Sequence, residues 1–382
     1  MVTQDIRYIG VNDRDLDLFE GQYIIPEGVS YNSYMILDEK IAIMDTVDGQ
    51  KTEEFLANVQ RELAGRMPDY LVVNHVEPDH AGSIQALLCA YPQLQIVGNA
   101  KTIQMMGQYI SADFSKALIV KEGDSLSLGA HQLTFFMAPM VHWPEVMVTY
   151  DSRDKVLFSA DGFGKFGALD ADEDWDCEAR RYYFNIVGKY GAQVQALLKK
   201  AAALDIQIIC PLHGPVLKDN LAHYIEKYNI WSSYGVESEG VFIAYASIHG
   251  NTAQAAQQLK QILLDQGCVK VAMADLARDD MAEAVEDAFR YGKVVFAASS
   301  YDGGVMPFME DFLHHLQAKN YQKRTVALVE NGSWAPSAAR TMKNLVTGWK
   351  EIQLIEPAVT LRGAVKESDT AALQALAAAL LA

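Results

Sequence analysis

One short segment of the chain joins an apolar strand to a dense group of metal-binding side chains: YLVVNHVEPDH, residues 70–80. Its first residues form a nearly all-apolar run, which is typical of a buried strand. The loop that follows holds two imidazoles and two carboxylates within six residues, and they are His75, Glu77, Asp79 and His80. A polar surface turn is the alternative for any one of them. Four together at a strand end favour a metal site, because imidazole and carboxylate are common metal ligands.

Three further apolar runs are followed in the same way by a histidine or a carboxylate. QLTFFMAP (132–139) precedes His142, KVLFSAD (155–161) ends at Asp161, and IQIICPLH (206–213) ends at His213. In α/β folds, sites are built at the carboxyl ends of strands. Seven such ligands exceed the need of one tetrahedral zinc, so the sequence predicts two metals that share one carboxylate. The sulfur-free set suits iron, manganese or zinc.

The chain divides into two unlike parts, which we expect to be domains of residues 1–238 and 239–382. In the first part, short apolar strands mix with helical stretches. They include an expected hairpin, YNSYMIL (31–37) with KIAIMDTV (40–47), and an expected helix over 52–63. This mixture favours sheets covered by helices on their outer faces. The polar stretch NIWSSYGVESEG (229–240) is interpreted as a linker.

The second part alternates strand and helix regularly. Strands are expected at 241–247, 269–276, 293–300, 324–331 and 353–359, and each is followed by a helical stretch. Five such units predict a doubly wound parallel sheet of the flavodoxin type. The first loop of this sheet is Ser247-Ile248-His249-Gly250-Asn251-Thr252. Its small and hydroxyl residues before a helix can wrap a phosphate, although Ser, Asn and Thr are also ordinary helix caps.

Composition excludes several classes of protein. The 382 residues carry a net charge of −17, which argues against sequence-independent nucleic-acid binding and against adhesion to anionic membranes. No apolar run is long enough for a transmembrane helix, and the first residues do not resemble a signal peptide. None of the four cysteines forms a CxxC pair, so a rubredoxin-type site is not expected, and the pattern suits a reducing cytoplasm.

A few residues have simple structural interpretations. Cys89 and Cys210 are expected in the core, and His131, His223 and the pair His314–His315 are interpreted as surface or helix residues. The segment GFGKFG (162–167) matches a dinucleotide-binding fingerprint, but the acidic stretch that follows is no apolar helix. Its glycines are interpreted as a tight turn beside Asp161. The acidic stretch DADEDWDCE (170–178) is interpreted as solvated surface.

The metal-binding pattern resembles a known fold. It is similar to the metallo-β-lactamase fold, whose hydrolases usually read H-x-H-x-D-H, but here Glu77 replaces the second histidine. H-x-E-x-D-H with the later His, Asp and His resembles the flavodiiron proteins, which join that domain to a flavodoxin domain. The resemblance covers essentially the whole chain. It implies an α/β protein with an N-terminal αββα sandwich and a C-terminal doubly wound sheet.

The resemblance also implies the cofactors and their sites. One iron would be held by His75, Glu77 and His142, and the second by Asp79, His80 and His213, with Asp161 bridging. The loop 247–252 would hold the FMN phosphate. Two loops would contact the flavin ring, and they contain Ser299, Ser300, Tyr301, Asp302, Gly303 and Gly304, and then Asn331, Gly332, Ser333 and Trp334. Tyr301 or Trp334 could stack on the ring, with packing of these aromatics as the alternative.

The resemblance finally implies an activity. Electrons would pass through FMN to the diiron centre and reduce O₂ to water, or NO to N₂O. The protein would be a cytoplasmic head-to-tail homodimer or dimer of dimers served by an external donor such as rubredoxin. Tyr183, within RRYYFNIV (180–187), is a candidate proton donor behind the metal ligands, with aromatic packing as the alternative. Two other functions stay open: a zinc hydrolase tethered to a flavodoxin-like module, and a non-catalytic electron carrier with a structural metal.

Overall fold

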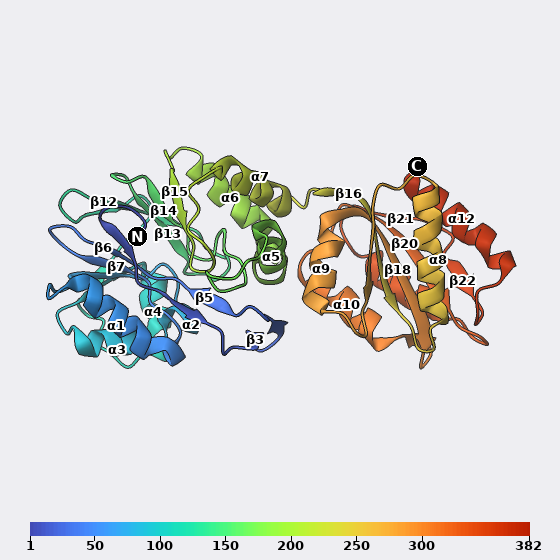
Figure 1. Ribbon diagram of the computed structural model, residues 1–382, viewed down its shortest axis with the longest axis horizontal. Coiled ribbons are helices and arrows are strands. Elements are labelled where there is room, and N and C mark those ends of the chain that lie inside the picture. The colour runs from blue at the N-terminus through green and yellow to red at the C-terminus, as the bar shows by residue number, and fades with distance from the viewer. The chain divides into compact units, whose positions relative to one another are not determined.

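The computed structural model describes residues 1–382 and divides into two compact units. The first unit comprises Met1–Tyr183 and Ala192–Asn229, and the second comprises Phe184–Gly191 and Ile230–Ala382. Both units mix helices with sheets, as the sequence predicts, and Figure 1 shows each of them. The expected domain boundary after residue 238 stays a prediction.

The first unit contains two main sheets (Figure 1). The six-stranded sheet has the order β1 (Ile6–Tyr8), β6 (Tyr34–Ile36), β7 (Ala42–Met44), β8 (Tyr70–Val72), β9 (Gln95–Gly98) and β10 (Leu118–Ile119). The five-stranded sheet has the order β11 (Ser125–Ser127), β12 (Gln132–Met137), β13 (Met147–Asp151), β14 (Val156–Phe158) and β15 (Ile208–Cys210). The expected hairpin is confirmed, because β6 and β7 pair antiparallel with Tyr34 opposite Met44.

Helices and two small ribbons complete this unit. The helices are α1 (Thr52–Leu63), α2 (Pro78–Ala81), α3 (Ile84–Ala90), α4 (Ala100–Tyr109), α5 (Trp175–Tyr182), α6 (Gly191–Ala201) and α7 (Leu221–Ser232). The ribbons pair β2 (Val11–Asp13) with β5 (Val29–Tyr31), and β3 (Leu18–Phe19) with β4 (Tyr23–Ile24). In Figure 1, α1, α3 and α4 lie beside the six-stranded sheet, and α6 and α7 lie beside the five-stranded sheet.

The core of the first unit lies between the two sheets. Met44 and Val72 from the first sheet belong to the same buried cluster as Phe135 and Met147 from the second, and none of the four side chains is exposed. Every residue of β6, β7, β8, β13 and β14 is buried. Four of these strands, β6, β7, β8 and β14, accordingly carry the continuous apolar runs that made them visible in the sequence.

The second unit contains one parallel sheet with the order β17-β16-β18-β20-β21. Its strands are β16 (Ser238–Ala246), β17 (Val271–Asp275), β18 (Tyr291–Tyr301), β20 (Arg324–Asn331) and β21 (Ile352–Leu354), with the short additions β19 (Gly304–Val305) and β22 (Val359–Leu361). This is the strand order of the flavodoxin-like doubly wound fold. The expected doubly wound sheet is therefore confirmed.

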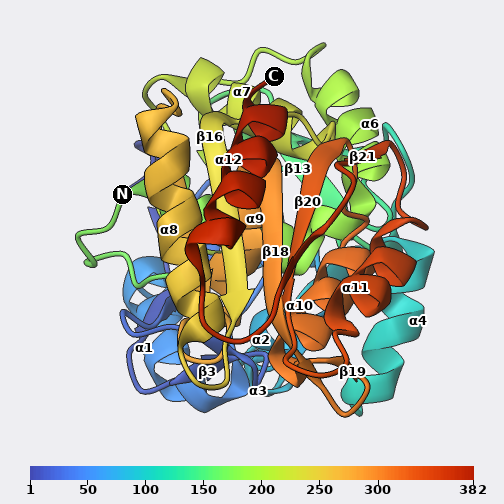
Figure 2. The same cartoon turned by 90° about the vertical axis from the view of Figure 1, so that its right-hand side faces the viewer.

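Helices cover both faces of this sheet. They are α8 (Asn251–Asp265), α9 (Met281–Arg290), α10 (Pro307–Ala318), α11 (Ala338–Val346) and α12 (Glu367–Leu381). Figure 2 shows α8 and α12 in front of the strands, with α9, α10 and α11 on the other face. Leu259 and Leu263 of α8 share a buried cluster with Leu373 and Leu376 of α12.

The expected fifth strand, 353–359, is wrong as one continuous strand. It is split into β21 and β22, and both of them pair in parallel with β20. Pro357 lies in the gap between the two pieces. A proline has no N–H to donate to a sheet ladder, which explains why the pairing is interrupted there.

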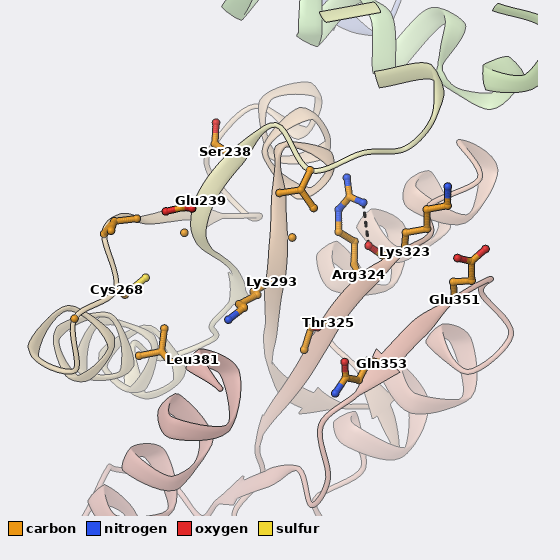
Figure 3. A pocket seen from close by; sticks show the side chains of 15 residues that line it. Ser238, Glu239, Cys268, Lys293, Lys323, Arg324, Thr325, Glu351, Gln353 and Leu381 are labelled. Atoms are coloured by element: carbon orange, nitrogen blue, oxygen red, sulfur yellow. Dashed lines mark hydrogen bonds between the residues drawn. The ribbon is translucent and has the colours of Figure 1, made fainter. Parts of the chain in front are cut away.

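The expected linker over 229–240 is mostly wrong. Helix α7 continues to Ser232 and β16 already begins at Ser238, so only residues 233–237 are irregular. Arg324 holds this short segment, because its guanidinium donates to the carbonyl oxygens of Tyr234 at 2.8 Å and Gly235 at 3.0 Å. Figure 3 shows this guanidinium turned toward the segment and away from Gln353, at the edge of a hollow of about 710 Å³.

The interpretation of the acidic stretch 170–178 as solvated surface is largely confirmed, because none of its residues is buried. Three of its carboxylates are nevertheless paired with cations, two of which are remote in sequence. Asp170 lies 2.7 Å from Arg14, Glu173 lies 3.2 Å from the buried Lys165, and Asp176 lies 2.9 Å from Lys227. The stretch also enters helix α5 at Trp175. No helix in the structure is both long and apolar enough to cross a membrane.

Two single-residue interpretations are also wrong. Cys89 is exposed, whereas Cys210 is buried as expected. His131 is completely buried and is no surface residue. Its Nδ1 lies 3.0 Å from Oδ2 of Asp151 and its Nε2 lies 3.6 Å from Oδ2 of Asp5. Burial lowers the pKa of His131, but Asp151 and Asp154 outweigh both burial and Arg153, and the net shift is upward.

We expect His131→Gln to destabilise the N-terminal domain mainly at low pH. A raised folded-state pKa means that the stabilisation is fully present below the unfolded-state pKa, about 6.5, and is lost as pH rises through the folded-state value. Loss of one partner of a buried ion pair costs about 3 kcal/mol. Thermal unfolding at pH 5.5 and pH 9 measures the difference. His314→Gln, at an exposed helix position, is the control, and an equal loss at both pH values would contradict the ion pair.

Candidate metal centre and flavin site

The seven predicted metal ligands converge at the ends of strands from both sheets of the first unit. Strands β12 and β14 both run antiparallel to β13, and β15 runs parallel to β14. The carboxyl ends of β12, β14 and β15 therefore lie at one edge of their sheet, and the loops there carry His142, Asp161 and His213. The loop after β8 and the single turn of α2 carry the other four ligands.

Four of these side chains form a first group, which we call group A: His75, Glu77, His142 and Asp161. Oε2 of Glu77 lies 3.1 Å from Nε2 of His75 and 3.0 Å from Nε2 of His142. Oδ2 of Asp161 lies 3.0 Å from Nε2 of His142. The donor atoms of group A therefore converge on one small volume that can hold a metal ion.

The other three side chains form group B: Asp79, His80 and His213. Oδ2 of Asp79 lies 3.3 Å from Nε2 of His80 and 3.3 Å from Nε2 of His213. Oδ1 of Asp161 lies 3.2 Å from Nε2 of His80. Asp161 thus presents one carboxylate oxygen to each group, which is the arrangement expected of a bridging ligand.

Several buried polar atoms of these groups have no hydrogen-bond partner. They are both carboxylate oxygens of Asp79, both ring nitrogens of His80, Oδ1 of Asp161 and Nε2 of His213. A buried polar atom without a partner is costly. So many orphaned atoms around two points fit the presence of cations, and the imidazole and carboxylate donors suit iron.

The carboxylates of groups A and B require positive charge beside them. Burial alone would lower the pKa of His142, but the hydrogen bonds to Asp161 and Glu77 outweigh burial and raise this pKa to about 9. Burial raises the pKa of Glu77, but hydrogen bonds from His142 and His75 lower it to about 2. The carboxylates therefore stay ionised and require cations beside them, either protons on the imidazoles or metal ions in their place.

A hollow gives small molecules access to this centre. It measures about 250 Å³ and reaches Glu77 and Asp79, with Leu18, Phe19 and Tyr31 in its wall. This space is partly apolar, ends at two candidate ligands and is large enough to admit a diatomic gas or water.

The predicted flavin loops also meet, in the second unit, around a hollow of about 610 Å³ at the carboxyl ends of β16, β18 and β20. Fourteen of the sixteen predicted residues line it: Ser247, Ile248, His249, Asn251, Thr252, Ser299, Ser300, Tyr301, Asp302, Gly303, Asn331, Gly332, Ser333 and Trp334. Gly250 and Gly304 do not line the hollow. Ala335, which ends the second predicted ring loop (330–335), also lines the hollow, and so do Ser337 and Gly363, which the sequence did not indicate.

The loops are fastened to one another by side-chain hydrogen bonds. Thr252 and Ser299 share a bond of 2.8 Å between their hydroxyl oxygens. The side chain of Asn331 donates to the carbonyl oxygen of Gly363 at 2.8 Å and accepts from its N–H at 2.9 Å. Trp334 is 89% exposed, so in this structure it lies open to any group that enters the hollow.

The remaining candidate loop, 162–167, behaves as a turn. The N–H of Gly162 donates to the carbonyl of Ser159, and the N–H of Gly164 donates to the carbonyl of Asp161. No helix opens directly after these glycines, so the dinucleotide fingerprint is excluded at this place.

Comparison with known proteins agrees with both sites. The family model described as ODP family beta lactamase matches residues 29–214, and a flavodoxin-domain model matches residues 242–366. The anaerobic nitric oxide reductase flavorubredoxin of Vibrio vulnificus is 31% identical over 87% of this chain and 70% of that protein. This chain belongs to the flavodiiron proteins.

Solved structures agree with the whole fold of this flavodiiron protein. Rubredoxin oxygen:oxidoreductase from Desulfovibrio gigas shares 25% identity, with a TM-score of 0.92 over 100% of this chain and 97% of that one. The flavodiiron protein from Giardia intestinalis shares 24% identity and the fold, with a TM-score of 0.94 over 99% and 94% of the two chains. The chain is accordingly an oxidoreductase with FMN and a diiron site as its cofactors.

Residues behind the ligands of this flavodiiron protein were not indicated by the sequence. Nδ1 of His75 lies 2.7 Å from Oε1 of Glu145, and Nδ1 of His213 lies 2.8 Å from the carbonyl oxygen of Ser30. Asp45 accepts from the N–H groups of Asn74 and His75. The only signal for Glu145 is its place in HWPE (142–145), a segment that resembles family sequence but indicated no role for this residue.

Tyr182, the last residue of α5, and Tyr183, which follows it, differ in their surroundings. The ring of Tyr183 packs against Tyr228, with centroids 5.1 Å apart. The ring of Tyr182 instead lies 5.5 Å from His213, and its buried hydroxyl has no hydrogen-bond partner. Burial raises the pKa of Tyr182, and the charges of Asp161, Asp79 and Glu77 raise it further. Tyr182 therefore stays protonated beside the metal ligands.

We expect Asn331→Ala to weaken FMN binding by up to about 30-fold. The substitution removes two hydrogen bonds to Gly363, each worth about 1 kcal/mol, and tenfold in affinity corresponds to about 1.4 kcal/mol. Fluorescence titration of the apoprotein with FMN measures the change. Gln261→Ala, which removes an exposed amide bonded to Asp265 on α8, should keep the wild-type affinity. Equal affinities of all three proteins would contradict a flavin held by this loop.

Proposed function

We propose that this flavodiiron protein passes electrons through FMN to a non-haem diiron centre and reduces O₂ to water, with reduction of NO to N₂O as the second activity. The first reaction consumes one O₂, four electrons and four protons and yields two waters. The second consumes two NO, two electrons and two protons and yields N₂O and one water. The observation that carries the proposal is Asp161, which presents one oxygen to each ligand group.

Seven residues would hold the two irons. His75, Glu77 and His142 would hold one, Asp79, His80 and His213 would hold the other, and Asp161 would bridge them. The grouping of donor atoms supports this assignment. When bound, the irons supply one-electron redox chemistry and open positions for a diatomic ligand. Oxygen donors such as Glu77 suit iron better than a further imidazole would.

The FMN would occupy the hollow formed by the loops after β16, β18 and β20. Its phosphate would lie against Ser247–Thr252 at the start of α8, where free N–H groups and the helix dipole favour an anion. Tyr301 and Trp334 are the aromatics available to its ring. The lining of the hollow supports this placement.

Proton delivery is assigned to Tyr182 in preference to Tyr183. The hydroxyl of Tyr182 is buried, protonated and without a partner in this structure, and its ring contacts His213. It is therefore free to donate a hydrogen bond to an oxygen atom that enters the centre. The rubredoxin named with the Desulfovibrio gigas enzyme supports an external donor of that class. The expected cytoplasmic homodimer or dimer of dimers also stays a proposal.

The proposal is tested by metal analysis and by turnover. The purified protein should contain about two irons and one FMN per chain. After anaerobic reduction, parallel exposure to O₂ and NO should show reoxidation by both, faster with O₂. Faster reoxidation by NO would reverse the order of the two activities. Two zincs per chain and no oxygen uptake would contradict the proposal and support the zinc hydrolase.

We expect Asp161→Ala to abolish reduction of both gases while FMN stays bound. The substitution removes the only carboxylate shared by the two groups, so both irons should lose a ligand. Oxygen uptake, iron content and flavin absorbance measure the effect. Asp205→Ala, which removes an exposed carboxylate paired with Lys155, is the control and should match the wild type. Unaltered oxygen uptake by Asp161→Ala would refute the ligand assignment.

Neighbouring tyrosines allow a matched test of proton delivery. Tyr182→Phe removes the hydroxyl beside His213 and should slow oxygen reduction by about tenfold or more, because positioned proton donors typically contribute about 10²- to 10⁴-fold. Tyr183→Phe should retain the wild-type rate. Stopped-flow reoxidation with intact iron and FMN content measures both variants. The reverse order of effects would assign the role to Tyr183.

A further inference from the structure

The two ligand groups are alike in their direct donors but unlike behind them. Group A offers two imidazoles and Glu77, group B offers two imidazoles and Asp79, and Asp161 is shared. What lies behind the donors distinguishes the two metal positions more clearly than the donors themselves do. Groups behind a metal-bound histidine set its tautomer and its basicity.

In group A, a carboxylate lies behind His75. Oε1 of Glu145 is 2.7 Å from Nδ1 of His75 and also accepts from the N–H of Val76 at 3.0 Å. Both residues of this His–Glu pair are completely buried. Since Oε1 is an acceptor, Nδ1 carries the proton, and the lone pair of Nε2 points into group A. The carboxylate also makes the imidazole a stronger electron donor.

In group B, neither histidine has such a partner. Nδ1 of His213 faces the carbonyl oxygen of Ser30 at 2.8 Å, which fixes the tautomer but carries no formal charge. Nδ1 of His80 is buried and has no hydrogen-bond partner. No carboxylate therefore hydrogen-bonds to Nδ1 of either histidine of group B, whereas a carboxylate hydrogen-bonds to Nδ1 of His75 in group A.

We propose that Glu145 is a positioning residue that makes the two metal positions unequal, so that the position in group A binds a divalent cation more tightly and favours the higher oxidation state of iron. The inference rests on the proposed diiron site. It follows from the added negative charge behind His75, since a more basic ligand stabilises the more positive ion. Loss of such a partner typically weakens metal binding by about 10- to 100-fold.

Titration of the metal-free, FMN-loaded protein with Co²⁺ tests the inequality without requiring iron. The wild type should show two dissociation constants, and Glu145→Gln should weaken only the tighter one, by about 10- to 100-fold. The glutamine keeps an acceptor oxygen for His75 and Val76 and removes only the charge. Two equal constants in the wild type, or equal weakening of both in the variant, would overturn the proposal.

A matched control separates the effect from general damage to the domain. Asp151→Asn neutralises another buried carboxylate that faces a histidine, His131 at 3.0 Å, outside both ligand groups. It should leave both Co²⁺ constants at their wild-type values. A change of either constant as large as in Glu145→Gln would assign the effect to lost stability and overturn the proposal.

The iron-loaded protein supplies a second, independent measurement. In Glu145→Gln, the reduction potential of one iron should rise by about 59 mV for each tenfold lost in ferric over ferrous affinity, as followed by Mössbauer spectroscopy during a redox titration. Unchanged potentials would overturn the proposal. Failure of the wild type to bind iron would instead contradict the diiron function, whereas the Co²⁺ titration would still decide the role of Glu145.

Discussion

Three carboxylates buried among four imidazoles dominate the structure of the N-terminal domain. Glu77, Asp79 and Asp161 lie so close together that their charges must be balanced by cations. The surrounding fold meets this need at one place, where the ends of strands from two sheets come together. Glu145, Asp45 and Ser30 then fix the loops and rings that carry the ligands. Among the orphaned atoms that remain, metal ions would satisfy the oxygens of Asp79, Oδ1 of Asp161 and the Nε2 atoms of His80 and His213.

The two domains bind different ligands, and each uses a different kind of side chain to do so. The metal centre is made of charged side chains, because a cation is held by lone pairs that must be anchored from behind. The flavin hollow is lined by hydroxyls, glycines and amides with two exposed aromatics. An anionic phosphate is held by N–H groups, and a flat ring is held by packing against apolar surface. This division agrees with the uneven charge of the chain, whose acidic residues are concentrated in the first domain. Part of the net charge of −17 comes from the three carboxylates of the metal site, whose charge the metal ions would balance.

Residues with a local signal were predictable and those with distant partners were not. All seven metal ligands follow apolar runs, and the three flavin loops follow strands of a regular alternation. His131 had no such signal, because the aspartates that bury it come from the N-terminus and from a neighbouring hairpin. The ion pairs of the stretch 170–178 had no local signal either, because two of the cations, Arg14 and Lys227, are remote in sequence. Tyr182 and Tyr183 are adjacent, and only the direction in which each ring points assigns the metal-facing place to Tyr182.

The sequence by itself determined the elements, the fold class and the set of candidate ligands. They can be predicted from the spacing of apolar residues and from the types of side chain that follow each strand, and both are local properties of the sequence. The family resemblance already implied how the ligands divide into two groups and that Asp161 lies between them. The tertiary structure alone decided that a carboxylate hydrogen-bonds to Nδ1 of a histidine in only one of the two groups. This fact depends on distances between residues far apart in the chain, such as the 2.7 Å between His75 and Glu145. Such distances are set only when the sheets pack.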